Sequence, residues 1–315
     1  MGKPDTVMQS YLSDKRRFAD MFNGVFFKGR QIIHSEDLQE ASERYSDPGG
    51  IVSNRFRDVK MFLKNGGTFR ILAVENQKHI DYAMPHRCMQ YDVMEYAKQL
   101  RDLRNYNKDQ GLLASAAEKM CGITGKDRLT PIYTLCLYHG EELWDGPRNL
   151  KDMMDFGTDG DGFSAFFADY PLRLFCVNSA ENFEMFHTEL RELFGALKYR
   201  RDKTGLLRLL EKNDSYTHLS AETAEALTTL FNAPALWKKW KEMQSMKKEG
   251  EEYDMCQALL ELQEESKAEG KALGIVQGNL EKTKTVIKNM LERGFSDEDI
   301  CALAECSVEM IDSLR

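Results

Sequence analysis

Residues 54–77 (NRFRDVKMFLKNGGTFRILAVENQ) constrain the fold most, because they predict two strands joined by a tight turn. Apolar and polar residues alternate over residues 55–63, which is typical of a half-buried strand. One predicted face carries Phe56, Asp58, Lys60 and Phe62, and the other carries Val59, Met61 and Leu63. Asn65-Gly66-Gly67 supplies residues suited to a hairpin turn. Residues 69–75 are nearly continuously apolar, as expected of a strand buried on both faces.

The hairpin brings two acids together in either register that its turn allows. If Gly66-Gly67 is the loop, paired positions sum to 133 and Asp58 lies directly opposite Glu75. If Asn65-Gly66 is the loop, the sum is 131 and the two acids are diagonal neighbours. Directly opposed residues have Cβ atoms roughly 5 Å apart, and diagonal ones are roughly 7–8 Å apart. Both registers therefore leave the two carboxylates within reach of one hard cation such as Mg²⁺.

Two like charges on one face of a sheet destabilise it unless a metal or a basic partner balances them. The alternative to a metal is that Arg55, Arg57 or Lys60 neutralises Asp58 and that Glu75 simply ends a strand. The spacing of the acids does not decide between the two. Gln77, two residues beyond Glu75, is expected on the same face.

Longer blocks of sequence add a resemblance. Asp58, the hairpin and Glu75-Asn76-Gln77 resemble the PD-(D/E)XK nuclease signature, with Gln in place of the usual Lys. Together with three flanking blocks, over roughly the first 180 residues, they resemble the recombination-promoting nuclease family of YhgA-like transposases. These blocks are KPDTVMQSYLSDKRRFADMFNGVFF (3–27), ENQKHIDYAMPHRCMQYDVMEY (75–96) and LTPIYTLCLYHGEELWDGPRNLKDMMDF (129–156).

The resemblance implies an α/β fold: a restriction-endonuclease-like core with a mixed central sheet flanked by helices. Helical patterns beyond residue 180 predict an all-helical C-terminal extension. It also implies Mg²⁺ or Mn²⁺ held by Asp58, Glu75 and the backbone carbonyl of Asn76. Gln77 would orient the attacking water without supplying the charge of a Lys. Lys60, on the same face as Asp58, is a candidate substitute for that charge, and Lys78 is another.

Three further residues are candidates for the site. In the resembled superfamily the opening helix often lends an acid, which makes Asp20 a candidate third acid; pairing with Arg16 or Arg17 is the alternative. Arg87 and Tyr91 lie one helical turn apart just after the second strand, where they would meet a phosphate. The alternative for Arg87 is an ion pair with Glu95 or with an acid elsewhere.

Other elements follow from periodicity and capping. We expect a helix over residues 7–27 capped at Ser13 or Asp14, a short strand at 31–33 and a loop over 34–50. A helix over 81–104 is expected, with Met89, Val93, Tyr96, Leu100 and Leu103 as its buried stripe. Strands are expected at 129–138, which is followed by a structural or substrate-proximal His139, and at 172–177.

The charge of −8 does not by itself suggest a DNA partner. Residues 1–110, however, carry 18 Lys and Arg against 15 Asp and Glu. The predicted site therefore lies in the basic part of the chain, which favours contact with phosphate. Seven scattered cysteines without a CxxC predict reduced thiols. The absence of a long apolar run or an apolar signal region predicts a cytoplasmic protein without a membrane partner.

Four regions are predicted: a nuclease-like domain (1–180), a helical extension (181–245), a charged helical linker (246–293) and a small helix-turn-helix-like tail (294–315). Ser296 and Ser307 are the expected starts of the two tail helices. Few basic residues lie in this tail, which favours packing or homo-oligomerisation over direct DNA reading. Trp237 and Trp240 are candidates to stack on bases, with helix packing as the alternative. Gly270, Gly274 and Gly278 predict a kinked or linker-like helix, with self-association as the alternative.

The sequence thus predicts a Mg²⁺-dependent endodeoxyribonuclease, associated with DNA recombination or transposition. The alternative is a nuclease-fold DNA-binding or assembly module with weak or no turnover.

Overall fold

The computed structural model describes residues 3–40, 58–65, 67–157, 162–231 and 281–314, and single residues at 238, 242, 245, 254 and 277. The chain divides into two compact units, Met1–Met255 and Cys256–Arg315. The predicted boundary at residue 180 falls inside the first unit. The predicted roles of Arg55, Arg57, Trp237, Trp240 and the three spaced glycines lie outside the described residues.

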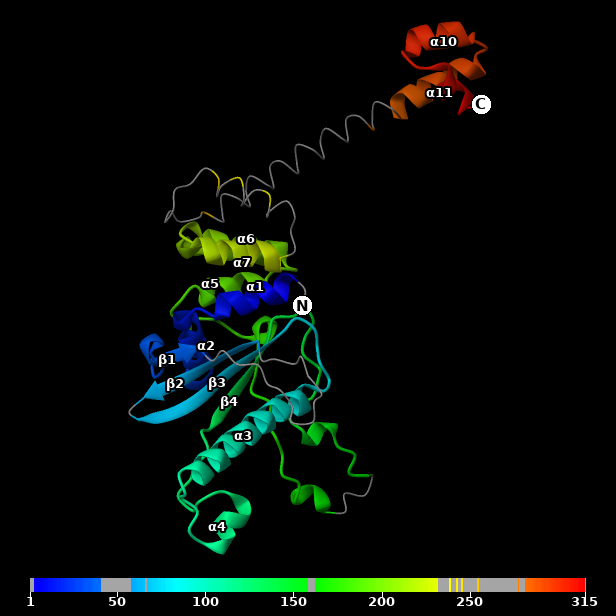
Figure 1. The fold of residues 1–315 in the computed structure, drawn as a ribbon. Coiled ribbons are helices and arrows are strands. Elements are labelled where there is room, and N and C mark those ends of the chain that lie inside the picture. The colour runs from blue at the N-terminus through cyan, green and yellow to red at the C-terminus, as the bar shows by residue number, and fades with distance from the viewer. Residues whose placement is uncertain are drawn as a thin grey trace. The chain divides into compact units, whose positions relative to one another are not determined.

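The first unit is an α/β structure around a five-stranded mixed sheet in the order β1-β2-β3-β4-β5. Strands β1, β2 and β3 are antiparallel, whereas β3, β4 and β5 run parallel. Helices α1 and α2 lie on one face of the sheet and α3 lies on the other (Figure 1). The strands are β1 (Leu38–Glu40), β2 (Val59–Asn65), β3 (Thr68–Gln77), β4 (Ile132–Tyr138) and β5 (Leu174–Cys176).

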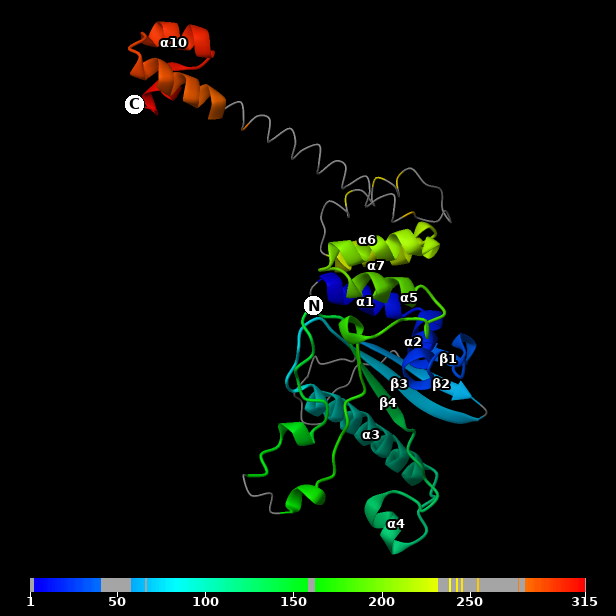
Figure 2. The ribbon, with the colours of Figure 1, turned by 180° about the vertical axis from the view of Figure 1, so that it is seen from behind.

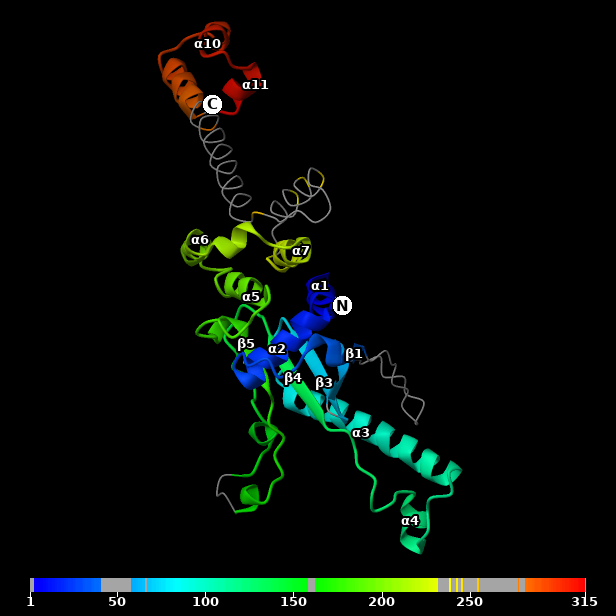
Figure 3. The same cartoon turned by 90° about the vertical axis from the view of Figure 1, so that its left-hand side faces the viewer.

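The helices of this unit cover both faces of the sheet. They are α1 (Lys3–Leu12), α2 (Lys15–Phe27), α3 (Met84–Asp109), α4 (Ala116–Cys121), α5 (Leu190–Lys198), α6 (Lys203–Lys212) and α7 (Ala221–Leu230). Short 3₁₀ turns occur at Ser35–Asp37, Lys151–Met153, Phe163–Ala165, Val177–Ser179 and Asp214–Thr217. Helix α7 packs against α1 and α5 on the side of the sheet away from α3 (Figure 2). Helix α3 extends beyond the sheet, with α4 beside its C-terminal end (Figure 3).

The predicted hairpin is confirmed, and the structure selects one of its two registers. Asn65 pairs with Thr68 and Val59 with Val74, so paired positions sum to 133. Val59, Met61 and Leu63 are buried, as the alternation predicts. Gly67 adopts a φ of 79°, which a residue with a side chain rarely takes.

The predicted helix over residues 7–27 is two helices. The chain breaks at Ser13 and Asp14, and the Asp14 side chain accepts hydrogen bonds from the amides of Arg16 and Arg17. Asp14 therefore caps α2, as expected of an N-cap acid.

The predicted strand at 31–33 is wrong. The side chain of buried Asn23 accepts hydrogen bonds from the amides of Ile32 and Ile33 and donates to the carbonyl of Ile33. Because a side chain engages this backbone, it does not join the sheet. The edge strand is β1 instead, which lies in the predicted loop and pairs Leu38 with Leu63.

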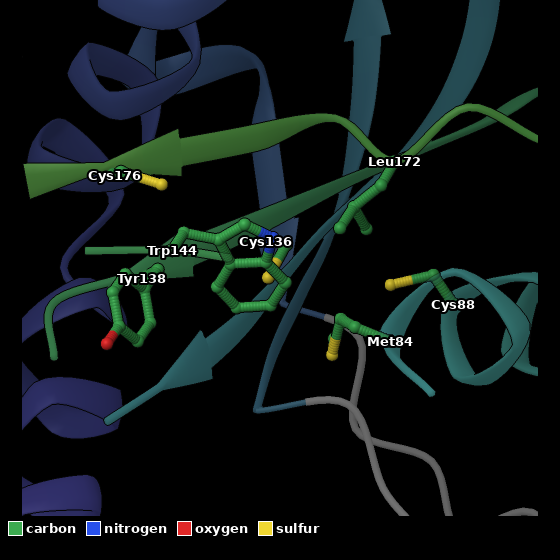
Figure 4. Packing of buried hydrophobic residues seen from close by; sticks show 7 residues of the cluster. All are labelled: Met84, Cys88, Cys136, Tyr138, Trp144, Leu172 and Cys176. Atoms are coloured by element: carbon green, nitrogen blue, oxygen red, sulfur yellow. The ribbon is translucent and has the colours of Figure 1, made fainter. Parts of the chain in front are cut away.

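The predicted buried stripe of α3 is wrong: Val93 is 58% exposed, and the other four members are only half-buried, namely Met89, Tyr96, Leu100 and Leu103. Helix α3 instead buries a face that begins with Met84, Cys88 and Tyr91 and continues with the acids Asp92 and Glu95. The apolar part of this face packs on β4 and on Trp144, as Figure 4 shows. Because Asp92 and Glu95 are buried on this face, polar side chains lie between this part of α3 and the sheet.

The described cysteines are all free. Cys88, Cys136 and Cys176 are buried, whereas Cys121 is exposed.

The second unit contains a helix over residues 281–292, α10 (Asp297–Ala304) and α11 (Val308–Asp312). Ser296 accepts a hydrogen bond from the amide of Asp299, and Ser307 is the N-cap of α11, so both predicted helix starts are confirmed. Ile287, Ile300 and Ile311 are fully buried and form the core of this unit. No described helix combines the length and the apolar composition required to cross a bilayer.

Candidate active site

Asp58 lies immediately before β2, at the end of the hairpin away from the turn. One of its carboxylate oxygens accepts a 2.7 Å hydrogen bond from the backbone amide of Asn76. Its backbone carbonyl accepts a 2.6 Å bond from the side chain of Gln9 in α1. In the observed register Asp58 corresponds to Glu75, so the two predicted acids come to the same end of the hairpin.

Glu75 is buried, with 1% of its surface exposed, on the face of β3 toward α3. Arg87 of α3 contacts it at 3.1 Å through Nη2 and contacts Asp81 at 2.9 Å through Nη1. Burial disfavours the charge on Arg87, but the Glu75 carboxylate and Tyr91 outweigh burial and raise the pKa of Arg87. Tyr91 therefore lies near Arg87, and Arg87 pairs with Glu75 and Asp81 rather than with Glu95.

Lys60 of β2 is on the same face of the sheet and pairs with Glu95 of α3. The distance from Nζ to the carboxylate is 3.1 Å, and both side chains are more than nine-tenths buried. Burial, with the nearby charge of Asp102, raises the pKa of Glu95 to about 7. Lys60 is thus held toward α3 by a carboxyl group that titrates near neutrality.

A third polar contact continues this layer toward β4. Asp92 accepts a 2.7 Å hydrogen bond from the hydroxyl of Thr134 and a 2.5 Å bond from the hydroxyl of Tyr170. The sequence interpretation missed Asp92 and gave Glu95 only as a possible partner of Arg87. A signal was present: both acids lie on the same helical face as the apolar Met84, Cys88 and Tyr91.

Asn76 and Gln77 end β3 with side chains on opposite faces. The Gln77 carbonyl accepts a 3.0 Å bond from the amide of His139, and its side chain is half-buried on the same face as Glu75. The Asn76 side chain is 5% exposed, and its polar atoms have no hydrogen-bond partner among the described residues. The backbone amide of Asn76, rather than its side-chain amide, donates the hydrogen bond to Asp58.

Asp20 does not join these acids. It is 2% exposed and accepts hydrogen bonds from the amides of His187 and Thr188 and from the Thr188 hydroxyl. It therefore holds the segment that leads into α5. In the parts of the chain that the structure describes, no three His, Cys, Asp or Glu side chains form a group that could hold a metal ion.

His139 is buried one residue beyond β4. Burial, followed by the charges of Arg200 and Lys78, lowers its pKa to about 3. Both ring nitrogens are without hydrogen-bond partners within the described residues, and Arg200 donates a 2.7 Å bond to its backbone carbonyl. A neutral, enclosed imidazole fits the expected structural role rather than that of a general base.

The donors at the end of the hairpin match a hard divalent cation in chemical type. Asp58, Glu75 and the Asn76 carbonyl supply oxygens, which Mg²⁺ prefers. The Arg87 guanidinium contacts one Glu75 oxygen, so Arg87 and a cation would compete for that carboxylate.

Comparison with protein-family models, with curated proteins and with solved structures found no match to this chain. Membership of the YhgA-like family therefore remains a prediction, based on the quoted sequence blocks.

Proposed function

We propose that the first unit is a metal-dependent endonuclease that hydrolyses phosphodiester bonds in DNA, in the context of recombination or transposition. The observation that carries this proposal is the hairpin register, which places Asp58 on the amide of Asn76, next to Glu75. Two carboxylates that converge from adjacent strands on one backbone segment are suited to sharing a cation.

Each residue of the site has a distinct role in this mechanism. Asp58, Glu75 and the carbonyl of Asn76 would hold Mg²⁺ or Mn²⁺, which would polarise a phosphate and lower the pKa of water. Gln77 would orient the attacking water through its side-chain amide. Lys60 supplies positive charge beside the site, and Glu95 fixes its ammonium group.

Arg87 and Tyr91 contact the phosphate in this proposal. Because Arg87 pairs with Glu75 in the structure, it must exchange this carboxylate for a phosphate oxygen when DNA binds. Arginine suits such an exchange, since its planar guanidinium donates hydrogen bonds equally well to carboxylate and phosphate.

The test is nicking of supercoiled plasmid in Mg²⁺ or Mn²⁺ by wild type and by Glu75→Gln, which keeps the shape of the side chain. The matched control is Glu211→Gln, the same change at an exposed position of α6. We expect Glu75→Gln to abolish nicking and Glu211→Gln to leave it unchanged. Equal nicking by all three proteins would refute the site.

The second candidate function is a DNA-binding or assembly module without turnover. The ion pairs Glu75–Arg87 and Lys60–Glu95 favour it, because they already neutralise the charges that catalysis would use. Fluorescence anisotropy with labelled duplex DNA distinguishes the two. A module binds DNA equally well with Mg²⁺ or with a chelator, and its binding is unchanged by Glu75→Gln.

A further inference from the structure

A groove lies on the opposite face of the sheet from Glu75, near the turn end of the hairpin. It encloses about 510 Å³ between α2, the turn that follows it, and strands β2, β3 and β4. Its lining residues are predominantly apolar and aromatic: Phe22, Phe26, Phe27, Ile32, Ile33, Leu63, Arg70, Leu72 and Tyr133. The volume lies within the range of about 300–1,000 Å³ that is typical of small-molecule sites.

The turn that follows α2 forms one wall of the groove, and hydrogen bonds as well as packing hold it in place. Lys28 and Gly29 have left-handed backbones, with φ of 55° and 84°, and both amides donate to the carbonyl of Asn23. The Asn23 side chain in turn holds the amides of Ile32 and Ile33. Ile33 is consequently buried in the wall, whereas Ile32 stands at the rim, 47% exposed.

Arg70 is the one charged residue among the described residues that line the groove. It lies opposite Leu63 in the hairpin, and its side chain is half-buried. Within the described part of the chain, no hydrogen bond or ion pair engages its guanidinium group. Tyr133, 41% exposed, adds a hydroxyl group to the same lining.

We propose that this groove binds a small amphiphile that carries a single carboxylate, such as a medium-chain fatty acid. The apolar walls contact the carbon chain, and the Arg70 guanidinium group pairs with the carboxylate. Charge complementarity selects this class: a neutral chain leaves Arg70 beside an apolar ligand, whereas a cation is repelled. This site is separate from the proposed nuclease site in both face and strand end, so neither proposal depends on the other.

The experiment is isothermal titration calorimetry of the full chain with decanoate, below its micelle-forming concentration. Decanol is the neutral ligand of the same chain length. Arg70→Gln removes the charge in the groove, and Lys64→Gln is the matched control. Lys64 is exposed near the same turn, but alternation along β2 places it on the other face of the sheet from Leu63. Ile32→Trp obstructs the groove from its exposed rim.

We expect saturable decanoate binding to the wild type that weakens about tenfold in Arg70→Gln and is unchanged in Lys64→Gln. Ile32→Trp should weaken decanoate and decanol alike, and Arg70→Gln should not affect decanol. Circular dichroism checks that every variant is folded. No saturable decanoate binding to the wild type, equal decanoate affinity in Arg70→Gln, or equal affinity of the wild type for decanol would overturn the proposal.

Discussion

The two faces of the central sheet differ sharply, although β2, β3 and β4 supply both. The face toward α1 and α2 is largely apolar, and Val74, Leu135 and Leu137 are fully buried in it. The face toward α3 carries Lys60 and Glu75, each paired with a charged residue of the helix. Alternation along a strand separates the two sets, because successive side chains point to opposite sides.

This difference separates what holds the fold from what serves a site. Burial of apolar side chains stabilises roughly in proportion to the area removed from water. Buried ion pairs have no such net benefit, because desolvation offsets their attraction, and apolar residues of similar volume often do as well. Net stability therefore explains the paired charges under α3 poorly.

The largest expected effect is on the polar face. Lys60→Met leaves Glu95 buried without its cation, and we expect a loss of about 4 kcal/mol in the free energy of unfolding at pH 8. At pH 6 the loss should be smaller, because burial raises the pKa of Glu95 to about 7 and protonation removes its charge. Guanidinium titrations at the two pH values measure both.

The double variant Lys60→Met with Glu95→Leu is the control for this prediction. If the pair contributes little net stability, the double variant should unfold within about 1 kcal/mol of wild type. A single variant as stable as wild type at pH 8 would contradict the assignment of a buried ion pair.

On the apolar face, Leu135→Ala should cost about 3 kcal/mol, because it leaves a cavity at a fully buried position. This loss should not change between pH 6 and pH 8. The matched control is Val93→Ala on α3, which should change the free energy of unfolding by less than about 0.5 kcal/mol because Val93 is exposed. Comparable losses in the two variants would mean that α3 is rotated from the position described.

Leu135 and Val93 mark where sequence analysis succeeds and where it fails, because Leu135 lies in a predicted strand and Val93 was expected to be buried. The hairpin could be predicted because alternation and the Asn-Gly-Gly turn are local signals, and they limited the register to two choices. Leu63, Met61 and Val59 followed from the same alternation. The apolar stripe on α3 failed at Val93, because helical periodicity says which residues share a face but not which face meets the sheet.

The remaining errors have a common cause. Asp20 contacts His187 and Thr188, and Asn23 holds Ile32 and Ile33, so side-chain hydrogen bonds to distant or irregular backbone decided both outcomes. Hydrophobic patterns carry no information on such bonds. For the same reason the sequence could place Asp58 near Glu75 but could not show that Arg87 contacts Glu75.

His139 is a buried polar residue just beyond the end of β4. The pH dependence of the free energy of unfolding tests its burial. Its pKa is lowered to about 3, chiefly by burial, whereas an unfolded His titrates near 6.5. The unfolded chain therefore binds a proton that the folded chain does not, and stability falls as the pH decreases below about 6.5. Between pH 7 and pH 5 the expected loss is about 2 kcal/mol.

Urea titrations of wild type, His139→Gln and His34→Gln measure this contribution. His139→Gln should remove most of the pH dependence, and His34→Gln is the control for replacing an exposed histidine. An unaltered pH dependence in His139→Gln would show that the imidazole is hydrated and titrates normally.

The smallest expected effect concerns Arg87, which joins the polar face to the proposed metal site. Arg87→Gln removes a positive charge from Glu75, so we expect Mn²⁺ to bind about fivefold more tightly, an increase of roughly 1 kcal/mol for this partly exposed group. Calorimetric titration with Mn²⁺ measures this affinity, and Arg104→Gln, on the exposed far part of α3, is the control.

Plasmid nicking by Arg87→Gln should be slower than by wild type, because the phosphate loses its arginine. Tighter metal binding with slower cleavage is the combination that the proposed exchange of Arg87 between carboxylate and phosphate requires. Weaker metal binding would instead mean that Arg87 orients Glu75 for the cation, and Mn²⁺ binding to neither protein would favour the module without turnover.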